Sequence, residues 1–143
     1  MMNHARTFLL LTLCALTATA WASAAPPTLA QTLKARRWQK RVLLLLAPTA
    51  TTPDYIRQKA LLNAASAELR ERDFLVLDVL ADQLSAADQR FLQQEFQLSA
   101  KQFAVVLIGK DGGVKRTEAR PIGPKELFGT VDKMPMRRQE MRR

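Results

Sequence analysis

The chain has 143 residues, of which 48% are hydrophobic and 24% charged, and its 22 basic and 13 acidic residues give a net charge of +9. This length excludes more than one domain of ordinary size, but it is sufficient for a hydrophobic core that needs no disulfide staples. The positive charge favours anionic partners.

Residues 1–24 are typical of a secretory signal peptide. Arg6 supplies a short basic region, the segment 8–20 is apolar, and Ala22-Ser23-Ala24 matches the A-x-A cleavage signal. The 13 residues of the apolar segment fall short of the roughly 20 that a membrane-spanning helix needs. We therefore expect a periplasmic or secreted protein, with a signal peptide at 1–24 and a single domain at 25–143.

Cleavage after Ala24 removes Cys14 and His4, the only cysteine and the only histidine of the chain. Their loss excludes thiol redox chemistry, Cys or Ser nucleophiles activated by a histidine, and ordinary zinc sites. The remaining 119 residues carry 21 basic and 13 acidic side chains, a net charge of +8.

The processed chain begins with an amphipathic segment. Residues 28–39 predict a helix with Leu29, Leu33 and Trp38 near one face, and we expect Trp38 to cover one end of the core. The basic cluster 36–41 around it resembles a nucleic-acid or membrane patch. Because an exported protein rarely meets nucleic acid, we expect no nucleic-acid partner and favour the role of Trp38 in the core over a patch.

Three apolar runs predict strands at 42–47, 74–80 and 103–108. The third run should be central in the sheet, because it is apolar throughout. Asp111-Gly112-Gly113 follows it and is typical of a hairpin turn. Weaker alternation at 114–118 then predicts an edge strand.

Helices are predicted between these strands. Thr52 as N-cap and Pro53 at the first helical position start one helix, and apolar residues that recur every seven positions extend it to Leu69. The segment 85–88, Ser-Ala-Ala-Asp, matches a capping box and starts a second helix that runs to about Gln97.

Asp78 interrupts the second apolar run, and an acid in an apolar strand can serve catalysis if burial raises its pKa. No second acid or base stands at a spacing that completes a mechanism, so we expect Asp78 to point outward. A carboxylate-dependent hydrolase, or another non-redox enzyme, is the alternative that this residue leaves open.

The order strand, helix, strand, helix, strand, strand, helix predicts the topology. A right-handed crossover makes the first two strands parallel neighbours, and the hairpin adds an antiparallel pair on the other side. We expect an α/β fold with a four-stranded mixed sheet of order 2-1-3-4 and helices on both faces. This is the arrangement of the thioredoxin core.

Four segments together resemble a known family, the domain of unknown function DUF4174. They are RVLLLLAP at 41–48, ERD at 71–73, LIGKDGGVK at 107–115 and MPMRRQEM at 134–141. The last two at this distance are the most specific, and the resemblance covers nearly all of the processed chain. It implies an exported bacterial protein with a thioredoxin-like or peroxiredoxin-like fold, related to domains of vertebrate extracellular-matrix proteins, and no established activity.

In thioredoxins and peroxiredoxins the reactive cysteine lies after the first strand, at the start of the following helix. The matching stretch here, 48–53, contains no sulfur, and Lys101-Gln102-Phe103 stands where thioredoxins have a proline before the third strand. We therefore expect no oxidoreductase activity. Thr51 and Thr52 are candidates to receive an anion or a backbone carbonyl, or they only cap the helix.

The C-terminal segment 133–143 carries five basic residues and one acidic residue, half of the charge of the processed chain. A last helix opens at Gly123-Pro124 and should end before Pro135. The arginines of the tail either dock an anionic partner or are only solvated. They are Arg137, Arg138, Arg142 and Arg143.

Three methionines of the tail, Met134, Met136 and Met141, are weak candidates for Cu(I) ligation, since thioethers select this ion. The neighbouring arginines oppose a cation, and Met134 and Met136 instead suit packing against the last helix. By elimination, we expect a non-catalytic binding module without a cofactor, which docks an anionic protein or a cell-envelope surface and spans no membrane after processing.

Overall fold

The computed structural model describes residues 25–143, and the predicted signal peptide lies outside them. The helices and strands, in chain order, are α1 (Leu29–Arg36), β1 (Arg41–Ala47), α2 (Pro53–Ala64), α3 (Ser66–Glu71), β2 (Phe74–Leu80), the 3-10 turn η1 (Ala81–Gln83), α4 (Ala86–Phe96), β3 (Ala104–Ile108), β4 (Val114–Glu118), α5 (Pro124–Val131) and α6 (Pro135–Glu140). None of the helices in residues 25–143 is long and apolar enough to cross a membrane.

The strands form one four-stranded sheet of order β2-β1-β3-β4, as predicted. β1 runs parallel to β2 with Arg41 opposite Phe74, and antiparallel to β3 with Val42 opposite Ile108. Every residue of β1 and β3 is buried, whereas β4 is a largely exposed edge. The prediction of a central third strand and an edge fourth strand is confirmed.

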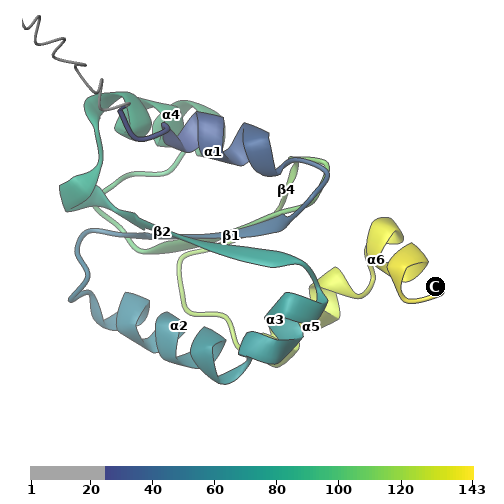
Figure 1. Ribbon diagram of the computed structural model, residues 1–143. Helices are drawn as coiled ribbons and strands as arrows, with labels where there is room; N and C mark the ends of the chain where they lie inside the picture. Colours follow the sequence, from purple (N-terminus) through teal and green to yellow (C-terminus); the bar gives the residue numbers. More distant parts are fainter. Residues whose placement is uncertain (1–24) are drawn as a thin grey trace, which may run out of the picture.

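Helices cover both faces of the sheet, with α1 and α4 on one side and α2, α3 and α5 on the other (Figure 1). Because side chains alternate along a strand, Leu43 and Leu45 of β1 enter the core under α2, α3 and α5. Leu44 and Leu46 enter the core under α1 and α4. The short helix α6 lies beside the sheet, next to one of its ends (Figure 1).

The helix starts depend on specific caps. Thr28 and Gln31 form a complete capping box at α1. At α4 the Ser85 side chain accepts from the Asp88 amide at 3.1 Å, but the Asp88 carboxylate accepts from the Leu29 amide at 2.9 Å. Only half of the predicted capping box therefore forms, because Asp88 connects α4 to the start of α1.

Two helix predictions need correction. The helix predicted from Pro53 to Leu69 breaks at Ala65, which has φ −110° and ψ 28°, although Leu69 remains buried. Pro135 does follow the end of α5, but it also begins α6. A proline suits the first position of a helix as well as the residue after one.

Candidate binding site at the hairpin end of the sheet

The place where thioredoxins carry their cysteine holds three threonines. The hydroxyls of Thr49 and Thr51 are 2.9 Å apart, and the Thr52 hydroxyl accepts from the Thr49 amide at 3.3 Å. Thr52 occupies the N-cap position of α2 but makes no side-chain capping bond. The predicted cap is therefore wrong in this respect, and the anion-binding role of Thr51 and Thr52 stays a prediction.

Asp78 lies on the exposed side of β2, as expected. Its carboxylate is 2.8 Å from Lys59 Nζ of α2. Burial, together with the charge of Asp78, raises the pKa of Tyr55 beside it above the ordinary value of 10.0, which moves the phenol further from ionisation. The arrangement is a surface ion pair with a neutral phenol, and it offers no second carboxylate for acid and base catalysis.

Arg137 of the C-terminal tail is not at the surface, where both interpretations of the tail place it. Its side chain is only 7% exposed, with Nη2 at 2.5 Å from Glu71 Oε1 and Nε at 3.3 Å from Asp132 Oδ1. The Asp132 carboxylate also accepts hydrogen bonds from Nε and Nη2 of Arg72, each at 2.9 Å. Arg137 thus connects α6 to the end of α3.

Arg41 and Lys110 hold the other side of α6. The Arg41 side chain, 1% exposed, donates to Glu140 through both Nη atoms at 3.2 Å and to the Arg72 carbonyl at 2.8 Å. Lys110 Nζ lies 2.7 Å from Glu140 and 2.8 Å from Asp73. Each buried cation therefore has a carboxylate partner, as buried charges require.

The pKa values follow from these contacts. The Lys110 hydrogen bond lowers the pKa of Asp73, and the Arg72 hydrogen bond lowers that of Asp132. Burial of Glu140 opposes its ionisation, but the hydrogen bonds from Lys110 and Arg41 outweigh it and lower its pKa. All three carboxylates are thus held in the charged form.

These side chains form one ionic network, here called the signature cluster. Its members come from all four segments that resemble the known family, together with one residue after α5. They are Arg41, Glu71, Arg72, Asp73, Lys110, Asp132, Arg137 and Glu140. The most specific segments of the sequence therefore meet in space, where they attach α6 to the sheet.

Beside the signature cluster, Trp38 is exposed rather than buried, which corrects the prediction. Its side chain is 63% exposed, and its φ of 67° lies in the left-handed region. The Trp38 amide donates to the Lys110 carbonyl. Trp38 also lines a groove of about 410 Å³ with Met134, Pro135 and Met136 of the tail. This surface is called the Trp38 groove.

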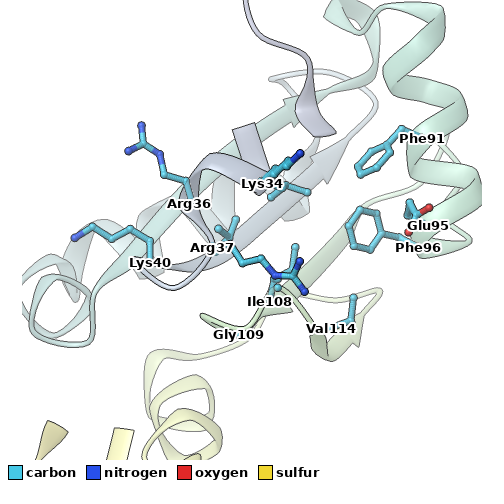
Figure 2. A pocket seen from close by; sticks show the side chains of 13 residues that line it. Lys34, Arg36, Arg37, Lys40, Phe91, Glu95, Phe96, Ile108, Gly109 and Val114 are labelled. Carbon is cyan, nitrogen blue, oxygen red and sulfur yellow. The ribbon is translucent and has the colours of Figure 1, made fainter. Parts of the chain in front are cut away.

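A second groove, of about 360 Å³, lies between α1, α4 and the β3–β4 hairpin. Lys34, Arg36, Arg37 and Lys40 line it, and Figure 2 shows Arg37 reaching across it while Arg36 and Lys40 point away. The members of the basic cluster are therefore divided: Arg41 is buried, Arg37 reaches across this groove, and Arg36 and Lys40 point away from it (Figure 2).

The other tail residues have different surroundings. Arg138, Arg142 and Arg143 are exposed and form no ion pair within the described part of the chain. Met134 packs against the core, as expected, whereas Met141 is 52% exposed. Within residues 25–143 no three His, Cys, Asp or Glu side chains could hold a metal ion.

The family described as domain of unknown function DUF4174 matches residues 32–140. The chain belongs to the DUF4174 family. The match includes every residue of the signature cluster, from Arg41 to Glu140, so the ionic attachment of α6 lies within the family domain.

The DUF4174 chain is also similar to a much longer protein and to solved structures of other proteins. Coiled-coil domain-containing protein 80 of Danio rerio is 27% identical over 140 residues, which cover 81% of this chain and 16% of that protein. The chain thus spans about a sixth of its relative. The 2-Cys peroxiredoxin of Plasmodium vivax has a TM-score of 0.54 at 18% identity, covering 76% of this chain and 84% of that one.

Trxlp from Edwardsiella tarda has a TM-score of 0.53 at 23% identity, covering 74% of this chain and 95% of that one. At these identities the likeness concerns the fold alone. The predicted thioredoxin-like fold and the resemblance to DUF4174 are confirmed.

The sequence-based predictions miss two parts of this site: the exposure of Trp38 and the burial of Arg41. A usable signal was present for Arg41, because this cation directly precedes an apolar run in one of the family segments. A charge that adjoins a central strand needs a partner once it is buried. No local signal identifies that partner, which lies 99 positions away.

Proposed function

We propose that this protein is an exported, non-catalytic binding module that docks an acidic protein segment in the Trp38 groove. Export rests on the predicted signal peptide. Residues 25–143 contain no histidine or cysteine, so the thioredoxin-like fold is present here without its usual reactive group. Binding is the role that this combination favours.

The observation that carries the proposal is the backbone and exposure of Trp38. A bulky side chain in the left-handed region costs of order 1–3 kcal/mol, and such strain is concentrated at functional sites. Burial does not offset it, because the side chain is 63% exposed. Tryptophan is among the residues that contribute most to protein interfaces. The strained backbone of Trp38 keeps its side chain exposed, where a partner can contact it.

The chemistry of the groove specifies the partner. Methionine side chains adapt to varied apolar surfaces, and Met134 and Met136 line the groove with Trp38. Arg138 within α6 and Arg142 and Arg143 after its end are exposed, and arginine pairs readily with carboxylates. The groove, together with these tail arginines outside its lining, therefore suits an acidic segment that carries a large apolar side chain.

A titration with a fluorescein-labelled peptide of alternating Glu and Phe tests the proposal by fluorescence anisotropy. Trp38→Asn removes the indole, and asparagine tolerates the left-handed backbone. We expect at least about tenfold weaker binding, as for the loss of an interface anchor. Ile56→Gln is the matched control, because Ile56 is 54% exposed on α2 across the sheet, and it should bind normally.

Charge is tested separately by changing arginines 138, 142 and 143 to Gln. This variant should lose much of the salt dependence of binding, because screening then has fewer pairs to weaken. Equal affinity of Trp38→Asn and the wild type would contradict the proposal. So would binding to vesicles of anionic phospholipid in preference to the peptide, since the occupant would then be a membrane surface.

A further inference from the structure

The second groove lies on the other side of the hairpin and shares only Gly109 with the Trp38 groove. It is here called the α1–α4 groove. Its volume of about 360 Å³ falls within the range of small-molecule sites. Its walls come from α1, α4 and the β3–β4 hairpin, so three separate parts of the chain meet around it (Figure 2).

The apolar wall of the α1–α4 groove is aromatic on one side. Phe91 and Phe96 of α4 form an edge-to-face pair, with ring centroids 5.7 Å apart and planes at 83°. Val114 of β4 faces the groove from the hairpin and is 46% exposed. Aromatic rings prefer offset or edge contacts with a further ring, so a flat apolar body suits the space between Phe96 and Val114.

Arg37 supplies a fixed cation to this space. Its Nε–H donates to the Asp111 carbonyl at 2.7 Å, and it passes so close to Gly112 that a Cβ there would lie 2.8 Å from Nε. No carboxylate of residues 25–143 forms an ion pair with Arg37. Its remaining N–H groups point into the groove, toward Phe96 and Val114 (Figure 2), where they can bind a carboxylate with two hydrogen bonds.

The charges around the groove set the charge of its ligand. Lys34 and Arg36 line it and form no ion pair among the described residues, while Lys40 has a loose pair of 3.5 Å with Asp73. Glu95 is the one acid in the lining, beside Phe96 (Figure 2). This favours a molecule with an anionic group at Arg37 and an uncharged body toward Glu95, because a second carboxylate there would be repelled.

We propose that the α1–α4 groove binds a small aromatic carboxylate, with the carboxylate on Arg37 and the ring between Phe96 and Val114. The two grooves are adjacent, since Arg37 Cζ lies 6.0 Å from the centroid of the Trp38 ring, but the two proposals concern different ligands and are tested by different variants.

Isothermal titration of the purified protein with 2-naphthoate tests this site, with 2-naphthalenemethanol as the uncharged probe of the same shape. We expect saturable 1:1 binding of the carboxylate, at least about tenfold tighter than the alcohol, as for a charge-assisted pair. Arg37→Gln and Val114→Glu should each weaken binding by about tenfold or more, since one removes the cation and the other adds a repelling carboxylate.

Matched controls lie on α2, across the sheet. Arg57→Gln and Ile56→Glu make the same charge changes at exposed positions and should retain wild-type affinity. The exposed edge position of Val114 makes Val114→Glu informative even if Arg37→Gln alters the hairpin. Wild-type affinity in either groove variant, equal binding of the alcohol, or no saturation up to the solubility limit of the probe would overturn the proposal.

Discussion

Arg137 illustrates how a charged side chain can hold this fold together. It lies almost fully inside the protein, yet all of its carboxylate partners keep some contact with water. The desolvation penalty of these ion pairs is therefore reduced, because only the cation loses most of its contact with water. Arg137 therefore stabilises α6 through geometry and packing as much as through charge.

Replacing Arg137 with Gln should lower the free energy of unfolding by about 2 kcal/mol, since Glu71 and Asp132 lose a charge-assisted partner. Arg138→Gln, one position further along α6 and exposed, should change it by less than about 0.5 kcal/mol. Urea unfolding of the two variants measures the difference. Equal stability would show that the Arg137 contacts contribute nothing.

Trp38 and Arg41 show the limit of sequence reasoning at this scale. Hydrophobicity assigns the tryptophan to the core, but the structure exposes it, and the structure buries the arginine although it belongs to a basic cluster. Arg41 is buried because Glu140, 99 positions later, neutralises it. Trp38 is exposed because the backbone bond to Lys110 fixes its loop. Both causes are contacts between distant parts of the chain, which no local pattern contains.

Among the elements, the strands are the most predictable from sequence, because an apolar run with no polar face has only a central strand as its natural place. The helices are less predictable from the sequence. The seven-residue repeat from Tyr55 to Leu69 continues through the break at Ala65, since both α2 and α3 bury one side against the same core. Helix α6 is not predicted from the sequence, because Pro135 is interpreted there only as the end of the preceding helix. Pro135 is also the first residue of α6.

The attachment of α6 should depend on pH. The pKa values of Glu140, Asp132 and Asp73 are lowered in the folded protein, so their contribution to stability is present above their ordinary values of 4.5 and 3.8. It is lost as the pH falls through the lower, folded values. Lys110 and Arg137, which face Glu140, keep their charge throughout this range, because burial is outweighed by hydrogen bonds to carboxylate partners, which raise their pKa values.

Glu140→Gln should therefore reduce the free energy of unfolding at neutral pH by roughly 2 kcal/mol. It should also flatten the decline in stability below pH 4.5, the ordinary value for this carboxyl. Urea unfolding at a series of pH values measures both effects. Glu95→Gln, an exposed carboxylate outside the signature cluster, is the control. A variant with wild-type stability and an unchanged pH profile would contradict this account of α6.

At the scale of the whole molecule, both grooves lie at the same end of the sheet. The hairpin, the α1–β1 loop and α6 meet there (Figure 1), and the two grooves open on either side of Gly109. The thioredoxin-like fold carries its chemistry at the start of α2 in its redox members, where this chain has threonines. The binding role proposed above therefore uses a different surface from the one that carries the reactive cysteine in those members.

The central claim is that an acidic protein docks on the Trp38 groove, and photo-crosslinking tests it most directly. The substitution Trp38→p-benzoylphenylalanine places a crosslinker in the groove, and the same substitution at Ile56 is the control. The account predicts that irradiation in the envelope fraction links position 38, but not position 56, to an acidic protein, and that high salt abolishes the link. Equal crosslinking at both positions, or none at position 38, would contradict it.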